Sequence, residues 1–212
     1  MGTVINFNAA RLTKHGNVVI PKSRMVYPAL FEAVLPKGEK DPAKAKFGAV
    51  FLIPKGADLK VLNEVLAQSS KEKFGRTKGV KSPLKKTEES KSLMKYSDDY
   101  PYYIRAQSNY QPAVVAPDGV TFVTDKAVAY GGRWAAASIV PFAWSHPTGG
   151  DGVSLSLNSV QLLDHADKIG GTIAPVEDEF VPANIDGGEA PDTGGFGNAA
   201  EEDEEEDDDF LN

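Results

Sequence analysis

The charge of this chain changes sign near its C-terminal end. Lys168 is the last basic residue. Residues 1–168 hold all 23 Lys and Arg residues against 15 acidic ones, a net charge of +8, whereas residues 169–212 hold 15 acidic residues and no base. The overall formal charge of −7 therefore conceals a basic body and an acidic tail. This division is typical of a protein whose body binds a polyanion and whose tail competes for that surface or recruits partners.

The body is long enough for one domain, and the tail is not expected to fold alone. About 170 residues precede the acidic segment, enough for a medium domain that buries roughly two thirds of its surface. The tail has too few large apolar side chains to offset the entropy of ordering it. We expect one folded domain followed by a disordered acidic tail.

Hydrophobic patterning predicts a mainly-β body. Runs rich in β-branched and aromatic residues at 25–35 and 47–53 indicate two strands. From residue 102 the pattern alternates, so that Tyr103, Arg105 and Gln107 share a polar and aromatic face suited to an open groove. Many strands with few helices favour a small β-barrel, and further strand-like stretches are 121–123, 127–130, 134–144 and 153–163.

One amphipathic helix is predicted after the second strand. Asp58 is a suitable N-cap, apolar residues recur at helical spacing from Leu59 to Leu66, and Gly75 offers a stop. The stretch 71–95 then carries nine basic residues against three acidic ones. Because it also contains Gly, Ser and Pro, we expect an exposed basic excursion.

Motifs for catalysis or metal binding are missing from the sequence. The chain has no Cys, which excludes disulfides, thiolate chemistry and Cys-type zinc sites. His15, His146 and His165 lie in separate segments, and there is no P-loop, GxSxG or GxGxxG motif. Asp98 and Asp99 are more typical of a solvated turn than of a nuclease metal site. We expect no enzymatic activity, cofactor or metal, and the apolar runs are too short to span a bilayer.

Basic and aromatic residues together indicate binding to single-stranded nucleic acid, which needs cations along the phosphates and aromatic faces for unpaired bases. Tyr103 and Trp134 are the preferred stacking residues, since Tyr103 shares a face with Arg105 and Trp134 follows Arg133 directly after a Gly pair. Each aromatic residue has an alternative role in the barrel core. The phosphate candidates are Lys46, Lys85, Lys86, Arg105, Lys126 and Arg133, and the stacking candidates are Tyr103, Tyr110, Tyr130 and Trp134.

The end of the tail places apolar residues after nine consecutive acids, Glu201–Asp209. Phe210 and Leu211 would form an anchor for a partner with a hydrophobic pocket ringed by Lys or Arg. The alternative is a purely solvating extension.

Several motifs resemble those of known proteins. The tip Asp207-Asp208-Asp209-Phe210 resembles the acidic, Phe-bearing C-terminal peptides of bacterial and phage single-stranded DNA-binding proteins. The motifs of the body resemble, over roughly residues 20–171, the phage single-stranded DNA-binding family once known only as a domain of unknown function. These motifs are Tyr27-Pro-Ala-Leu-Phe31, Phe47-Gly-Ala-Val-Phe-Leu-Ile-Pro-Lys55, Tyr100–Ala106, Tyr130-Gly-Gly-Arg-Trp134 and Gly152–Gln161.

The resemblance implies a fold and a role. The fold is an OB-fold, a five-stranded Greek-key barrel, over residues 1–171, with a flexible acidic tail over 172–212. The implied role is to coat single-stranded DNA during phage replication, recombination and repair in the cytoplasm of the infected bacterial host. The tail, through Asp207, Asp208, Asp209 and Phe210, would contact replication proteins.

The leading hypothesis is therefore a single-stranded DNA-binding protein without sequence preference, which binds duplex DNA or RNA more weakly. Its tail is expected to lie over the basic groove until DNA displaces it. The alternative is an acidic-tailed chaperone or assembly protein that binds basic partners and has no affinity for nucleic acid. A metal-dependent nuclease is a third, more remote hypothesis.

Overall fold

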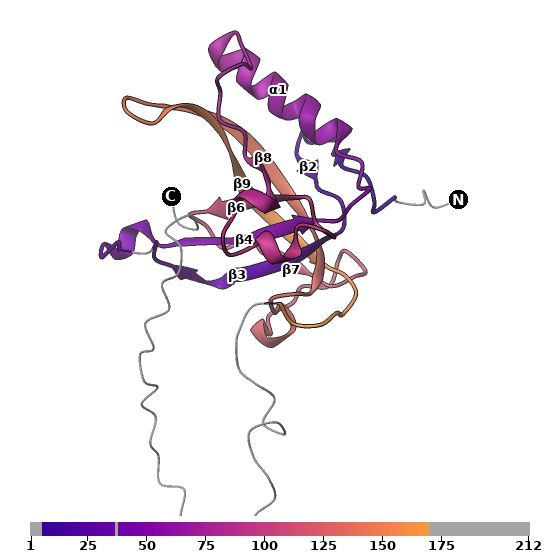
Figure 1. The fold of residues 1–212 in the computed structure, drawn as a ribbon. Helices are drawn as coiled ribbons and strands as arrows, with labels where there is room; N and C mark the ends of the chain where they lie inside the picture. The colour runs from indigo at the N-terminus through magenta and orange to yellow at the C-terminus, as the bar shows by residue number, and fades with distance from the viewer. Residues whose placement is uncertain (1–5, 37, 170–212) are drawn as a thin grey trace, which may run out of the picture. The chain divides into compact units, whose positions relative to one another are not determined.

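The computed structural model of the protein describes residues 6–36 and 38–169 (Figure 1). This part of the chain forms one nine-stranded sheet with a single α-helix, α1 (Lys60–Phe74). The prediction of a mainly-β body with one helix after the second long strand is confirmed. The strands are β1 (Arg11–Leu12), β2 (Val18–Val19), β3 (Ser23–Val34), β4 (Lys46–Ile53), β5 (Leu84–Lys86), β6 (Tyr102–Ser108), β7 (Ala113–Val115), β8 (Trp134–His146) and β9 (Gly150–Leu162).

Five of these strands pair in a closed circuit. β3 pairs with β4, β4 with β6, β6 with β9, β9 with β8, and β8 returns to β3. Within this circuit, four pairings are antiparallel and that of β6 with β9 is parallel. Two links are narrow, since β6 and β9 share one residue pair and β3 and β8 share two. The circuit has the strand number of the predicted OB-fold, a five-stranded and partly open barrel.

The inner face of the sheet forms the main hydrophobic core. Alternate residues of β6, Ile104 and Ala106, are fully buried there, and so are Phe51 and Ile53 of β4. The period of two along β6 thus separates the core face from the outward face, as the alternation predicts.

Helix α1 packs on the inner side of the β8–β9 hairpin, beside which it lies in Figure 1. Its buried residues Leu62 and Leu66 join the core cluster that contains Val153 and Leu155 of β9. Asp58 accepts a hydrogen bond from the backbone N–H of Lys60 at 2.9 Å, and Gly75 ends the helix at a φ of 67°. A left-handed residue at this position favours glycine, so the predicted stop is confirmed.

A second hydrophobic cluster lies on the outward face. Val50 and Leu52 of β4 and Tyr103 of β6 are covered there by Leu93, which is fully buried. Leu93 belongs to the predicted basic excursion. This excursion is therefore only partly an exposed loop, since it forms the end of α1, β5 and two 3₁₀ turns (Thr87–Glu89 and Met94–Tyr96).

Two smaller findings complete the fold. The strand predicted at 127–130 is wrong, because Lys126–Val128 is a 3₁₀ turn in which the Asp125 carboxylate accepts a hydrogen bond from the backbone N–H of Ala127. Across residues 6–36 and 38–169, α1 is too short and polar to be a membrane-spanning helix, and no other helix of the necessary length occurs.

Candidate nucleic-acid interface

One row of paired residues links four strands across the outward face. Gly48 of β4 is opposite Gln107 of β6, Gln107 is paired with Ser156 of β9, and Ser156 is opposite Val140 of β8. Paired residues lie on the same face of a sheet. The outward face of β4 and β6 therefore continues onto one side of the β8–β9 hairpin.

This hairpin side presents an apolar and aromatic stripe. Val140 and Phe142 are 39% and 47% exposed, and Trp144 is half-buried. The alternate residues Ile139 and Ala143 point to the other side, where Ile139 is buried and Ala143 packs against the core. The stripe thus lies on the side of the hairpin away from α1.

Trp144 is held in place by two residues of β9. Its Nε1 donates a hydrogen bond of 2.8 Å to Ser154 Oγ. Gly152, directly opposite in β9, has no side chain, and a Cβ there would lie 2.6 Å from Trp144 Cε2. The indole therefore lies against the Gly152 backbone in a fixed orientation.

Cations lie on the same outward face. Arg105 precedes Gln107 by two residues and is half-buried, and Lys46 precedes Gly48 by two. The Lys46 ammonium donates a hydrogen bond of 2.6 Å to Asn109 Oδ1. Together with the hairpin stripe these residues form a surface that we call the open face: Lys46, Arg105, Gln107, Val140, Phe142, Trp144, Ser154 and Ser156. Gly48 itself is buried.

The other half of the outward face is covered. Trp134 of β8 is opposite Arg24 of β3, and Arg24 is opposite Leu52 of the second cluster. The Trp134 ring lies 5.0 Å from Lys22 Nζ, 5.3 Å from Arg24 Cζ and 6.3 Å from the Tyr100 ring. The half-buried Trp134 ring thus already contacts two cations and a second aromatic ring of the protein.

The comparisons with known proteins agree with this fold. Residues 16–191 match the model of the family described as the ssDNA-binding protein of Enterobacter phage Enc34. The chain belongs to this family. The Enc34 family is named for DNA binding and not for a reaction, in agreement with the prediction that the chain is not an enzyme.

Solved phage proteins share the fold. The single-stranded DNA-binding protein of bacteriophage Enc34 in complex with ssDNA is 19% identical with a TM-score of 0.63, and the match covers 80% of this chain and 97% of that one. The same phage protein in a structure described without DNA is 18% identical with a TM-score of 0.63, covering 84% and 96%. Gp2.5, a single-stranded DNA-binding protein of bacteriophage T7, is 13% identical with a TM-score of 0.53, covering 74% and 96%. Among curated proteins, no sequence matches the chain.

The structure brings some of the predicted phosphate ligands together and separates others. Lys46 and Arg105 lie on the open face. Lys85 is opposite Tyr103 and faces outward, whereas Lys86, the next residue of β5, points to the other face. Lys86 is paired with Glu88 at 3.1 Å, which raises the pKa of its ammonium. Lys126 is not on the open face and is paired with Glu32 of β3 at 2.9 Å.

Arg133 is a correction to the sequence prediction. It is only 6% exposed, and its guanidinium donates hydrogen bonds to the carbonyl oxygens of Val128 at 2.7 Å and Leu163 at 3.1 Å. Both terminal nitrogens are thus used to join the segment before β8 to the end of β9. Arg133 supports the fold and is not available to a phosphate.

The predicted stacking residues also have structural partners. Tyr103 is 6% exposed beneath Leu93, so a role as an accessible stacking face is corrected. The Tyr130 hydroxyl donates to the Ala166 carbonyl at 3.1 Å, and its ring stacks on His165. Tyr110, just beyond the Lys46–Asn109 contact, is 83% exposed.

Phe142 and Trp144 are not among the stacking residues that the sequence predicts. Both stand in the strand-like stretch 134–144, where each aromatic residue has an alternative role in the barrel core. The alternation of Val140, Phe142 and Trp144 within the strand-like stretch was the available signal. The tail residues Asp207, Asp208, Asp209 and Phe210 lie outside the described residues.

Proposed function

We propose that the protein binds single-stranded DNA without sequence preference, and coats and protects single strands during phage DNA replication, recombination and repair. The observation that supports this most directly is the pairing of Gln107 with Ser156, which unites cations and aromatic residues on one face. The chain belongs to a family named for ssDNA binding, which agrees with this proposal.

Oligonucleotides bind to an OB-fold on strands 2 and 3 and on the loops between strands 1 and 2 and between strands 4 and 5. In chain order, β4 and β6 are strands 2 and 3 of the five-strand circuit, and the β8–β9 hairpin contains the loop between strands 4 and 5. The open face corresponds to these parts. Lys46, Lys85 and Arg105 would contact phosphates, while Phe142 and Trp144 would stack on bases. Stacking is tolerant of sequence because every base has a π-face.

The acidic tail would have two roles in this function. With a net charge of −15 against +8 on the body, it would compete with DNA for the open face at low salt. Its tip, Asp207, Asp208, Asp209 and Phe210, would recruit replication proteins. Duplex DNA or RNA would bind more weakly, and the protein would act in the cytoplasm of the infected bacterial host.

A titration of fluorescent oligo-dT and a matched duplex at several salt concentrations tests the proposal, with the full chain and a truncation after Gly171. We expect preference for the single strand, quenching of Trp fluorescence, a steep fall of affinity with salt, and tighter binding by the truncation. Equal affinity of the two chains at low salt would contradict competition by the tail. No binding by either would favour the acidic-tailed assembly protein instead.

A further inference from the structure

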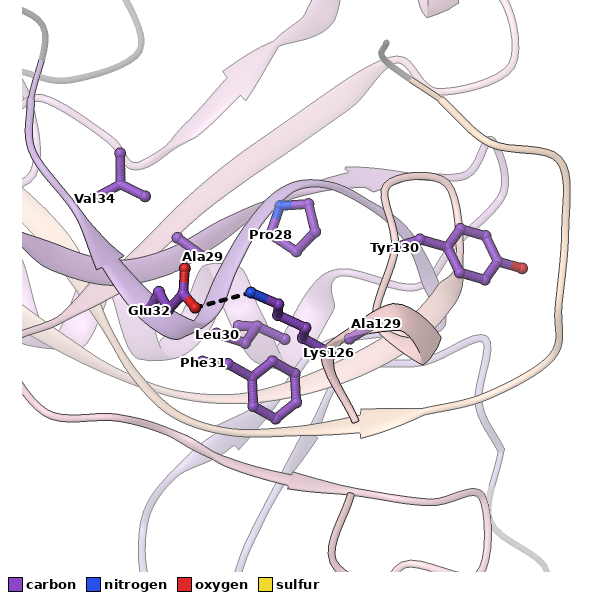
Figure 2. Close-up of a pocket in the computed structure, with 9 residues that line it drawn as sticks. All are labelled: Pro28, Ala29, Leu30, Phe31, Glu32, Val34, Lys126, Ala129 and Tyr130. Atoms are coloured by element: carbon purple, nitrogen blue, oxygen red, sulfur yellow. Dashed lines mark hydrogen bonds and ion pairs between the residues drawn. The ribbon is translucent and has the colours of Figure 1, made fainter. Parts of the chain in front are cut away.

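A pocket of about 300 Å³ opens on β3 beside the segment that leads into β8 (Figure 2). Its walls are apolar and come from Pro28, Leu30, Phe31, Val34 and Ala129. This volume is at the lower end of the range for small-molecule sites. It suits one planar group of the size of a nucleobase and is too small for a peptide segment.

The pocket lies where β3 departs from regular geometry. The register with β4 shifts between Val26 and Ala29, so β3 contains a bulge. Tyr27, within this bulge, has a φ of 50° and is 47% exposed. A positive φ is uncommon for an aromatic residue, and bulges re-aim strands next to functional sites.

A single ion pair spans the pocket. Lys126 Nζ lies 2.9 Å from Glu32 Oε1, and the two side chains are 70% and 76% exposed. In the view of Figure 2 the Lys126 side chain extends between Pro28 and Phe31 toward the Glu32 carboxylate. An ion pair this exposed contributes little to stability, so an incoming phosphate can replace the carboxylate.

The pocket also adjoins the open face. Its exposed lining residue Val34 is paired with Lys46 of the open face. A DNA strand that contacts Lys46 therefore passes Val34 at the edge of the pocket, where one base can enter.

We propose that this pocket takes one unstacked base of single-stranded DNA, and that Lys126 moves from Glu32 to an adjacent phosphate when the base enters. The inference rests on the proposed function and adds a site to it. In the free protein the Glu32 carboxylate pairs with Lys126, and it competes there with the DNA phosphate. The apolar walls explain how a base is held without hydrogen-bond recognition of its identity.

The first experiment blocks the pocket in the full-length chain. Val34→Trp places a bulky side chain at an exposed lining position, and Leu12→Trp makes a similar change on β1, where Leu12 is 55% exposed and outside the pocket. The probes are fluorescent oligo-dT and an oligonucleotide of equal length made of abasic residues. Val34→Trp should weaken binding of oligo-dT by about fivefold or more and leave the abasic strand unaffected. Leu12→Trp should change neither.

Equal affinity of Val34→Trp and the unmodified chain for oligo-dT would overturn the proposal, and so would equal losses for both probes. Failure of the unmodified chain to bind either probe would instead refute DNA binding itself. The two failures are thus distinguishable.

A second experiment needs no bulky substitution. Glu32→Gln should tighten oligo-dT binding severalfold because it frees Lys126, and Lys126→Gln should weaken it. In the Lys126→Gln background Glu32→Gln should have no effect, since the two residues act as a pair. Additive effects in the double variant would contradict the exchange of Lys126 from Glu32 to phosphate.

Discussion

The indole of Trp144 lies against the backbone of Gly152, its direct neighbour across the β8–β9 hairpin. A Cβ at position 152 would approach Trp144 Cε2 to 2.6 Å. Gly152→Ala should therefore displace the indole and break its bond to Ser154. We expect weaker binding of oligo-dT and a shifted Trp emission spectrum. Ser154→Ala is the control that removes only the hydrogen bond, and it should have the smaller effect.

Phe142 and Trp144 should contribute to DNA affinity more than to stability. Stacking of an aromatic side chain on a base contributes roughly 1–3 kcal/mol. Phe142→Ala and Trp144→Ala should thus each lower oligo-dT affinity by roughly fivefold to a hundredfold. Phe122→Ala is a suitable control, since Phe122 is 71% exposed and forms an isolated bridge with Val115, outside the open face. Equal losses at all three positions would exclude a specific role for the hairpin.

Arg133 should behave as a structural residue. Arg133→Met removes two hydrogen bonds from a buried guanidinium, and such bonds involving a charged group contribute roughly 1.5–3 kcal/mol each. Chemical denaturation should show a loss of about 2–4 kcal/mol in the free energy of unfolding. DNA affinity measured well below the denaturation midpoint should be nearly unchanged. A large loss of affinity with full stability would restore Arg133 as a phosphate ligand.

Lys46 and Arg105 should determine part of the salt dependence of DNA binding. Each phosphate contact releases counterions, so removing one cation makes the plot of log affinity against log salt shallower by about 1. We expect this change for Lys46→Gln and for Arg105→Gln. Lys73→Gln, an exposed position in the last turn of α1, should leave the slope unaltered.

Asp164 should make stability depend on pH. The hydrogen bond from Lys22, and after it the positive charge of Lys22, lower the pKa of the Asp164 carboxyl below its ordinary value. A lowered pKa means that the ionised form is favoured in the folded state, so this stabilisation is complete above the unfolded pKa and is lost as the pH falls through the folded one. Asp164→Asn should therefore be less stable than the unmodified chain at pH 7.

Thermal melts across the pH range would check this expectation. The difference between the two chains should shrink below pH 4 and disappear once Asp164 is protonated in both states. A difference that is constant down to the lowest pH would assign the effect to packing instead of charge.

Much of the fold followed from local patterns. The period of two in β6 predicted which side chains face the core, and Ile104 and Ala106 are buried as expected. Gly75 ends α1 because its backbone adopts a left-handed conformation that other residues rarely take. The local pattern does not separate every turn from a strand. The 3₁₀ turn at Lys126–Val128 lies in a short apolar run, and such a run is compatible with either structure.

The candidate site depended on contacts between distant segments. Tyr103 has the sequence context of an exposed groove residue, yet Leu93 covers it. Trp134 is half-buried and contacts Lys22, Arg24 and Tyr100. Nothing local to either residue signals these contacts. The register between β6 and β9, a single residue pair far apart in sequence, joins the hairpin to the face of β4 and β6.

Charge and periodicity are properties of neighbouring residues, and for this reason the sequence alone determined the basic body, the acidic tail, the mainly-β class and the inward or outward direction of side chains along a strand. Which outward side chains are covered, and which join one surface, was decided only by the tertiary structure. That choice depends on the pairing of strands and the packing of loops over long sequence distances, where many arrangements satisfy the same local pattern.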